Sequence, residues 1–220
     1  MIRVNTIYQT IQGEGVKTGV PMVLLRLQGC HVGCPWCDTK ETWSLGEGLP
    51  VALEKLPQGK SDVYAVAYPV DIVRFICNQW KTKWVLLTGG EPAEQDLTPL
   101  VEELHRAGRK VAIETSGTAR GHMASGADWV CVSPKLLMPG GRVVLPEVVE
   151  AAHEIKHVVG TERDIARLDD LLQGLSLRKG VVICLQPVSR SEKATELCVA
   201  TVLQRGWRLS IQTHYLIGVP

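Results

Sequence analysis

Short apolar runs alternate along the chain with longer segments of helical periodicity. The runs that predict buried strands lie at 23–27, 84–88, 111–114, 129–133 and 181–186, with weaker candidates at 155–159 and 209–211. Most of them end at a polar residue. Nearly continuous apolar strands of this kind are typical of a parallel sheet that is covered on both faces.

The segments between these runs predict helices at 71–80, 95–107, 161–173 and 192–204. In the segment 95–107, four apolar side chains recur at one-turn spacing, and Gly108 supplies a stop. Thr161 and Asp164 resemble a capping box. Alternation of strands and helices indicates an α/β fold with right-handed crossovers. A complete eight-fold barrel usually needs about 250 residues, so this chain predicts an incomplete, TIM-like barrel within one domain, 1–220.

The segment 43–69 interrupts this alternation. It is rich in Gly and Pro, has mixed charge and shows little periodicity, so it predicts a long surface excursion. Hydrophobic residues make up 45% of the chain, which excludes wholesale disorder. The net charge of +1 gives no global argument for binding nucleic acid or membranes. The N-terminus lacks the pattern of a secretion signal, and we expect a cytoplasmic protein.

The seven cysteines fall into two groups. Cys30, Cys34 and Cys37 form a C-x3-C-x2-C motif directly after the first buried strand. The other four are scattered among apolar neighbours, and we expect them to be small buried side chains: Cys77, Cys131, Cys184 and Cys198. A disulfide framework is not expected in a reducing compartment.

Three thiolates so close together predict a metal site. Thiolates are soft ligands that select zinc, copper(I) or iron–sulfur clusters. A structural zinc site normally takes four ligands, and His31, which directly follows Cys30, is poorly placed to be the fourth. Three thiolates suit a [4Fe-4S] cluster with one iron left open, as catalysis requires. The spacing favours the cluster, with zinc and unrelated thiols as alternatives.

Further motifs carry a family resemblance. Trp36 precedes the last cysteine of the motif, and the strand candidate 84–88 leads into Gly-Gly-Glu-Pro at 89–92. In these features the chain resembles the radical S-adenosylmethionine (SAM) superfamily. Within it, the chain resembles the 7-carboxy-7-deazaguanine synthase family of the queuosine and deazapurine pathway. The blocks that carry this resemblance lie at 11–15, 26–30, 37–39, 114–117, 133–135, 186–187 and 212–220.

The resemblance implies a set of cofactors and the residues that hold them. Cys30, Cys34 and Cys37 would hold three irons of the [4Fe-4S] cluster, and Thr39 would be a ligand of Mg²⁺, which keeps several waters. SAM would be bound by residues at the ends of several strands: Trp36, Cys37, Asp38, Gly90, Glu114, Ser116, Ser133, Pro134, Lys135 and Gln186. From the sequence alone, these polar residues could equally be loop or capping residues.

The resemblance also implies the substrate, 6-carboxy-5,6,7,8-tetrahydropterin. A radical rearrangement would contract its ring and release ammonia, which makes the protein a carbon–nitrogen lyase. Arg26 suits the carboxylate, because a guanidinium offers a two-pronged donor. The other expected contacts with the substrate are Ile11, Gln12, Gly13, Glu14, Thr88, His214 and Pro220.

Two other functions remain open at this stage. One is a glycyl-radical activating enzyme, which carries the same cysteine spacing and acts on a protein. The other is a zinc-stabilised binding module for RNA, which the near-zero net charge disfavours. For partners, the family implies a homodimer and an external one-electron donor such as a flavodoxin, without nucleic acid or membrane.

Overall fold

The computed structural model describes residues 1–45, 50–59, 61–123 and 125–219. Within these residues, nine strands form one sheet in the order β3-β1-β2-β4-β5-β6-β7-β8-β9. Their bounds are β1 Ile2–Ile11, β2 Pro21–Leu27, β3 Ala65–Ala67, β4 Trp84–Thr88, β5 Lys110–Thr115, β6 Trp129–Val132, β7 Glu154–Val159, β8 Val182–Pro187 and β9 Arg208–Leu209. From β2 to β9 all neighbours are parallel, whereas β1 runs antiparallel to β2 and β3.

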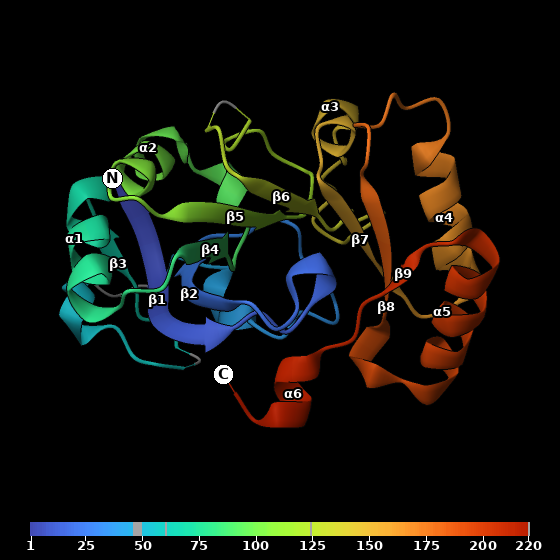
Figure 1. Ribbon diagram of the computed structural model, residues 1–220, viewed down its shortest axis with the longest axis horizontal. Coiled ribbons are helices and arrows are strands. Elements are labelled where there is room, and N and C mark those ends of the chain that lie inside the picture. The colour runs from blue at the N-terminus through green and yellow to red at the C-terminus, as the bar shows by residue number, and fades with distance from the viewer. Residues whose placement is uncertain (46–49, 60, 124, 220) are drawn as a thin grey trace.

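The main helices lie outside this sheet. Figure 1 shows α1 and α2 at one end of the molecule and α4 and α5 at the other, with α6 apart from both pairs. The bounds are α1 Pro69–Gln79, α2 Thr98–Arg106, α3 Pro146–Glu150, α4 Glu162–Leu172, α5 Glu192–Arg205 and α6 Thr213–Ile217. The mostly parallel sheet with outer helices confirms the predicted incomplete barrel. Among the described residues, no helix has the length and apolar character needed to cross a membrane.

Alternation along β2 decides which side chains face the site. Val23, Leu25 and Leu27 belong to the core that α1 and α2 cover, while Met22 and Leu24 pack in a separate inner core with side chains of β4 and β5. Side chains alternate between the two faces of a strand. The next inner position is therefore Arg26, beside Thr88 of β4. The inner face thus changes from apolar to polar at the carboxyl end of the strands.

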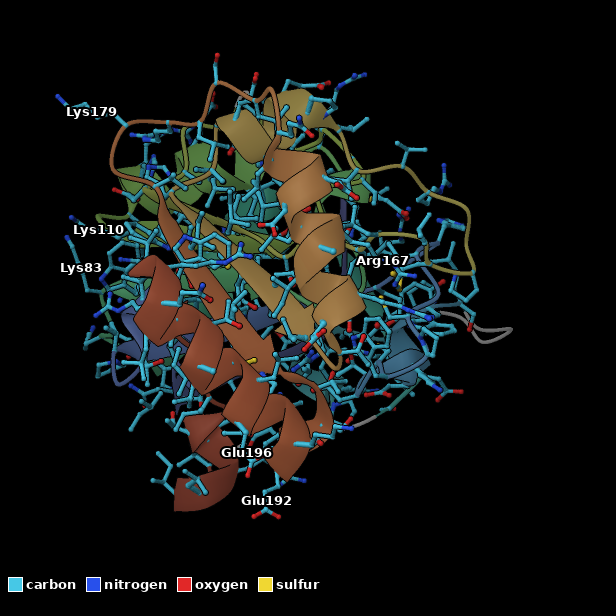
Figure 2. All side chains as sticks on the ribbon, turned by 90° about the vertical axis from the view of Figure 1, so that its right-hand side faces the viewer. Lys83, Lys110, Arg167, Lys179, Glu192 and Glu196 are labelled. Atoms are coloured by element: carbon cyan, nitrogen blue, oxygen red, sulfur yellow. The ribbon has the colours of Figure 1, made fainter. Side chains whose placement is uncertain are left out.

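The helix ends follow their sequence signals. At α4, Asp164 accepts hydrogen bonds from the Thr161 backbone N–H and hydroxyl, which confirms the capping box. The helix predicted at 95–107 begins only at Thr98. Figure 2 shows α4 and α5 side by side, with Arg167, Glu192 and Glu196 on their outer faces. An ion pair between Arg205 of α5 and Asp169 of α4 joins these two helices.

The prediction of a plain surface excursion at 43–69 is wrong in part. Residues 65–67 of this segment form β3 at the edge of the sheet, and Leu53 is buried beneath it in the core. The sequence analysis also missed β1 and α3. Of the four scattered cysteines, Cys131, Cys184 and Cys198 are buried as predicted. Cys77 is only half-buried, because it ends up where α1 leaves the core.

Candidate active site

A cleft of about 360 Å³ opens at the carboxyl ends of the parallel strands. This is the end at which barrel enzymes place their chemistry, since the loops after the strands converge there. Its wall combines the loop that carries the three cysteines (residues 30–37, the cysteine loop) with the turn at 89–91 and with side chains of five inner strands. One cleft therefore brings together motifs that are far apart in the sequence.

Backbone hydrogen bonds hold the cysteine loop in place. Gly29 N–H donates to Thr42 at 2.8 Å, and Cys30 N–H donates to Trp43 at 3.2 Å, so the start of segment 43–69 supports the loop. On the other side, Gly140 N–H donates to Val32 at 3.1 Å. A Cβ at Gly140 would lie 1.9 Å from the His31 carbonyl oxygen, so only glycine permits this approach.

The three thiols form a donor set that suits an iron–sulfur cluster. Burial raises the pKa of Cys30 to about 11 and raises that of Cys34 as well, so their thiolates need a cationic partner. Within the described residues, no three His, Cys, Asp or Glu side chains are close enough to hold one metal ion. Ligands of a single zinc must all approach it to about 2.3 Å, whereas a four-iron cluster takes each thiolate on a different iron. The loop therefore fits the cluster better.

The turn at 89–91 is shaped by glycine and by a buried carboxylate. Gly90 has φ +53°, and a Cβ there would lie 2.4 Å from the Gly29 carbonyl oxygen. Glu91 is buried and accepts hydrogen bonds from the Thr115 hydroxyl at 2.5 Å and the Ser116 N–H at 2.6 Å. Glu91 thus ties this turn to the end of β5, and Gly90 brings its backbone against the cysteine loop.

Charged side chains of both signs line the cleft. Lys156 of β7 forms ion pairs with Glu14, which follows β1, and with Glu114 of β5. Arg26, Lys135 and Arg190 also line the cleft, and none of them forms an ion pair within the described part of the chain. Burial lowers the pKa of Lys135, whose ammonium donates to Ser133. Cations without carboxylate partners make the cleft suitable for an anionic ligand.

Most of the predicted site residues line this one cleft. These are Glu14, Arg26, Cys30, Cys34, Trp36, Cys37, Asp38, Thr39, Thr88, Gly90, Glu114, Ser116, Ser133, Lys135 and Gln186. Gln12 lies just behind, where its amide donates to Glu114 at 2.9 Å. Ile11, Gly13, Pro134 and His214 do not line the cleft, although Gly13 accepts two hydrogen bonds from Thr213. Pro220 lies outside the described residues.

The sequence analysis did not assign several polar or charged residues of the cleft, among them Thr42, Glu91, Lys156 and Arg190. The sequence does hold a signal for Lys156. A lysine within the apolar run 155–159 indicates that one face of this strand meets polar groups. Arg190 has a left-handed backbone (φ +58°), as does Ser189 before it (φ +48°). Such conformations concentrate at functional sites, but the sequence gives no sign of them.

Known proteins share both the fold and these motifs. Residues 24–135 match the family model described as "Radical SAM superfamily", so the protein is a radical SAM enzyme. A 7-carboxy-7-deazaguanine synthase from Escherichia coli is 47% identical over 219 residues, 98% of either chain, and one from Buchnera aphidicola is 36% identical over the same share. The crystal structure of QueE from Escherichia coli superposes with a TM-score of 0.90, at 46% identity over 97% of this chain and 94% of that one. The chain belongs to the 7-carboxy-7-deazaguanine synthase family.

Membership decides between the alternatives left open by the sequence. A radical SAM enzyme implies a [4Fe-4S] cluster and SAM, and the relatives are synthases rather than activating enzymes or RNA-binding modules. Since the alignment covers 98% of both chains, segment 43–69 is no addition relative to the Escherichia coli protein.

Proposed function

We propose that this protein converts 6-carboxy-5,6,7,8-tetrahydropterin into 7-carboxy-7-deazaguanine with loss of ammonia, using SAM, a [4Fe-4S] cluster and Mg²⁺. One observation carries the proposal: the cysteine loop, the turn at 89–91, Arg26 and Glu14 all line a single cleft. The first two suit the cofactors. The last two offer opposite charges to a substrate that has a carboxylate at one end and N–H donors at the other.

Cys30, Cys34 and Cys37 would hold three irons and leave the fourth to SAM. When bound, the cluster and SAM supply the one-electron chemistry that generates a radical on the substrate, which is hard chemistry that no side chain offers. The protein contributes orientation. Gly90 allows close backbone approach, and Glu114 of β5 and Ser116, directly after that strand, present polar groups to the same space.

Arg26 would bind the substrate carboxylate. Its stem lies against Gly89, where a Cβ would approach Arg26 Cγ to 1.9 Å, so the turn and the arginine fit each other. Glu14 would accept hydrogen bonds from the N–H groups of the pterin edge, while Gln12 supports Glu114 from behind the cleft. These roles explain why two side chains of opposite charge, Arg26 and Glu14, line the same cleft.

Thr39 would be the protein's ligand to Mg²⁺. It lines the cleft next to the cysteine loop, with its hydroxyl 3.7 Å from Cys37 Sγ. A hydroxyl alone binds Mg²⁺ weakly, so substrate oxygens and waters have to complete the shell. The proposal therefore expects Mg²⁺ to bind together with the substrate. Thr39→Val should raise the Mg²⁺ concentration needed for half-maximal rate, whereas Thr39→Ser should not.

The proposal also includes a cytoplasmic homodimer that receives electrons from a protein such as a flavodoxin. The two-residue strand β9 at the open edge of the sheet is exposed, and an exposed edge is a surface on which a second copy can pair. Sedimentation of the cluster-loaded protein tests this part, and a monomer at micromolar concentration would refute it.

The cluster assignment is tested by removing one thiol. Cys34→Ala should lose the brown colour of the cluster and all product formation after anaerobic reconstitution. The matched control is Cys77→Ala, which removes a half-buried thiol at α1 and should keep both. Product is read by mass spectrometry with SAM, Mg²⁺, a one-electron reductant and the carboxypterin. Full activity of Cys34→Ala would contradict the assignment.

A further inference from the structure

One ammonium group stands between two carboxylates on the wall of the cleft. Lys156 is 3% exposed; its Nζ contacts the Glu14 carboxylate and lies 3.3 Å from Glu114 Oε1. Two amides complete the arrangement. Gln12 donates to Glu114 at 2.9 Å, and Gln212 donates to Glu14 at 2.8 Å. The carboxylates come from the ends of β1 and β5, which are not neighbours in the sheet, and Lys156 is the cation that pairs with both.

Glu14 and Lys156 are both charged in this arrangement. Burial alone would raise the pKa of Glu14, but the adjacent ammonium of Lys156 lowers it to about 2. Burial alone would lower the pKa of Lys156, but Glu114 and Glu14 hold it well above its ordinary value. Other titratable groups act on this triad from the surrounding elements: Glu154, Cys131, Lys135, Cys184 and His214.

We infer that Lys156 is a positioning residue that keeps Glu14 ionised and holds Glu14 and Glu114 in place as hydrogen-bond acceptors, one facing the substrate and the other facing SAM. The inference rests on the proposed function, which assigns Glu14 to the pterin and Glu114 to the cofactor. An ionised carboxylate only accepts hydrogen bonds, whereas a protonated one also donates. The lysine therefore sets the polarity of the binding position at Glu14.

Removal of the ammonium should change that polarity. Two carboxylates that share a buried site without a cation cannot both stay ionised near neutral pH, and the pKa of one of them rises. When the protonated carboxyl is that of Glu14, its O–H faces the N–H groups of the pterin. Two donors then meet where the wild-type protein offers an acceptor to a donor. Binding of the substrate becomes dependent on pH in a range where the wild-type protein shows no such dependence.

Kinetics test this with Lys156→Met, Lys156→Arg and the exposed control Lys193→Met on α5. For Lys156→Met, we expect kcat/KM for the carboxypterin to fall by about 100-fold or more, as for a buried ion pair that loses one partner. The pH at which its kcat/KM falls on the acid side of the pH profile (the acid limb) should rise by about one pH unit or more. Lys156→Arg keeps the charge and should keep the wild-type acid limb, as should Lys193→Met. An acid limb that moves in Lys156→Arg would overturn the inference.

A second measurement does not depend on turnover. In cluster-loaded protein with ¹³C-labelled glutamate, the Glu14 carboxyl should stay ionised down to pH 4 in the wild type, and one carboxyl of the pair should titrate above pH 5 in Lys156→Met. If Lys156→Met does not fold, Lys156→Gln removes the same charge with a polar side chain, and one carboxyl of the pair should titrate above pH 5 in it as well. Unchanged titration in folded Lys156→Met would refute the role of Lys156. A wild-type protein that forms no product would instead refute the proposed function, and the titration would still decide this inference.

Discussion

At the scale of single residues, burial decides the protonation state of several groups near the cleft. His157 of β7 is buried, with Nε2 2.9 Å from the Asp164 carbonyl oxygen and with Nδ1 lacking a partner among the described residues. Burial lowers its pKa from 6.5 to about 4. The folded protein therefore holds this imidazole neutral, with its Nε2 hydrogen placed to donate to Asp164.

This burial makes stability depend on pH. Between pH 4 and 6.5 the unfolded chain binds a proton at His157 and the native protein does not, so stability is full above pH 6.5 and is lost as the pH falls. From pH 7.5 to 5.5 we expect a loss of about 1.4 kcal/mol from this residue. Urea unfolding at both pH values checks it against His157→Gln, which should lose about 1.4 kcal/mol less than the wild type. An equal loss in both proteins would contradict the prediction.

The role of Arg26 can be separated from general damage to the cleft. Arg26→Gln removes a charge-assisted hydrogen bond to the substrate carboxylate, which is worth about 1.5–3 kcal/mol, so kcat/KM should fall by about 10- to 100-fold. Inhibition by tetrahydropterin, which lacks the carboxylate, should not change. Arg163→Gln on the exposed face of α4 is the control. Equal weakening of both pterins would show that Arg26 does not read the carboxylate.

At the scale of elements, hydrophobic periodicity predicts the strands whose buried side chains are apolar, and it misses a strand that buries polar side chains. The inner strands β2, β4, β5, β6 and β8 were predicted because their apolar runs are continuous. In contrast, β1 carries two buried polar residues in its middle, Asn5 and Thr6. Asn5 donates hydrogen bonds to Gln28 and Ser61, and Thr6 donates one to Pro57. Its polar residues have partners only once the tertiary structure exists, and no local pattern reveals that.

The site shows the same division. The cysteine loop and the turn at 89–91 are local motifs, and the family resemblance they carry assigns both to the cofactors. The contribution of Lys156 depends on three strands that approach one another only in the barrel. Likewise, the support that Gly140 gives to the cysteine loop comes from a turn that is far away in the sequence. Contacts of this kind become predictable only after the topology is known.

The C-terminal segment closes one side of the cleft through few contacts. Thr213 N–H donates to Gly13 at 2.9 Å, and the Arg190 guanidinium lies 4.3 Å from the centre of the Tyr215 ring. Both Arg190 and Tyr215 line the cleft and are exposed. The contact therefore joins α6 to the turn after β8 at the rim of the site.

Loss of this contact should loosen α6 without unfolding the protein. A cation–π contact at an exposed position is worth about 0.5–1 kcal/mol. Arg190→Ala should therefore speed hydrogen exchange of the amides in 213–219 by about 2- to 5-fold. Arg163→Ala should not change it. Exchange that stays at the wild-type rate in Arg190→Ala would show that other contacts hold the segment.

At the scale of the whole molecule, the incomplete barrel separates support from chemistry. Apolar cores lie under α1 and α2 and under α4 and α5, while the polar inner face opens only at the carboxyl ends of the strands. At these carboxyl ends, the cleft is lined both by the three thiols of the cysteine loop and by the triad of Glu14, Lys156 and Glu114. This arrangement explains how a chain of 220 residues accommodates two small molecules and a cluster.

The central claim is that this cleft turns a carboxypterin into a carboxydeazaguanine with SAM as a cofactor. The most direct measurement is mass spectrometry of an anaerobic reaction in which SAM is about one-tenth of the substrate. The account predicts 7-carboxy-7-deazaguanine, formed only when SAM is present and in amounts that exceed the SAM added, because SAM is regenerated in each cycle. Accumulation of 5′-deoxyadenosine without that product would contradict it.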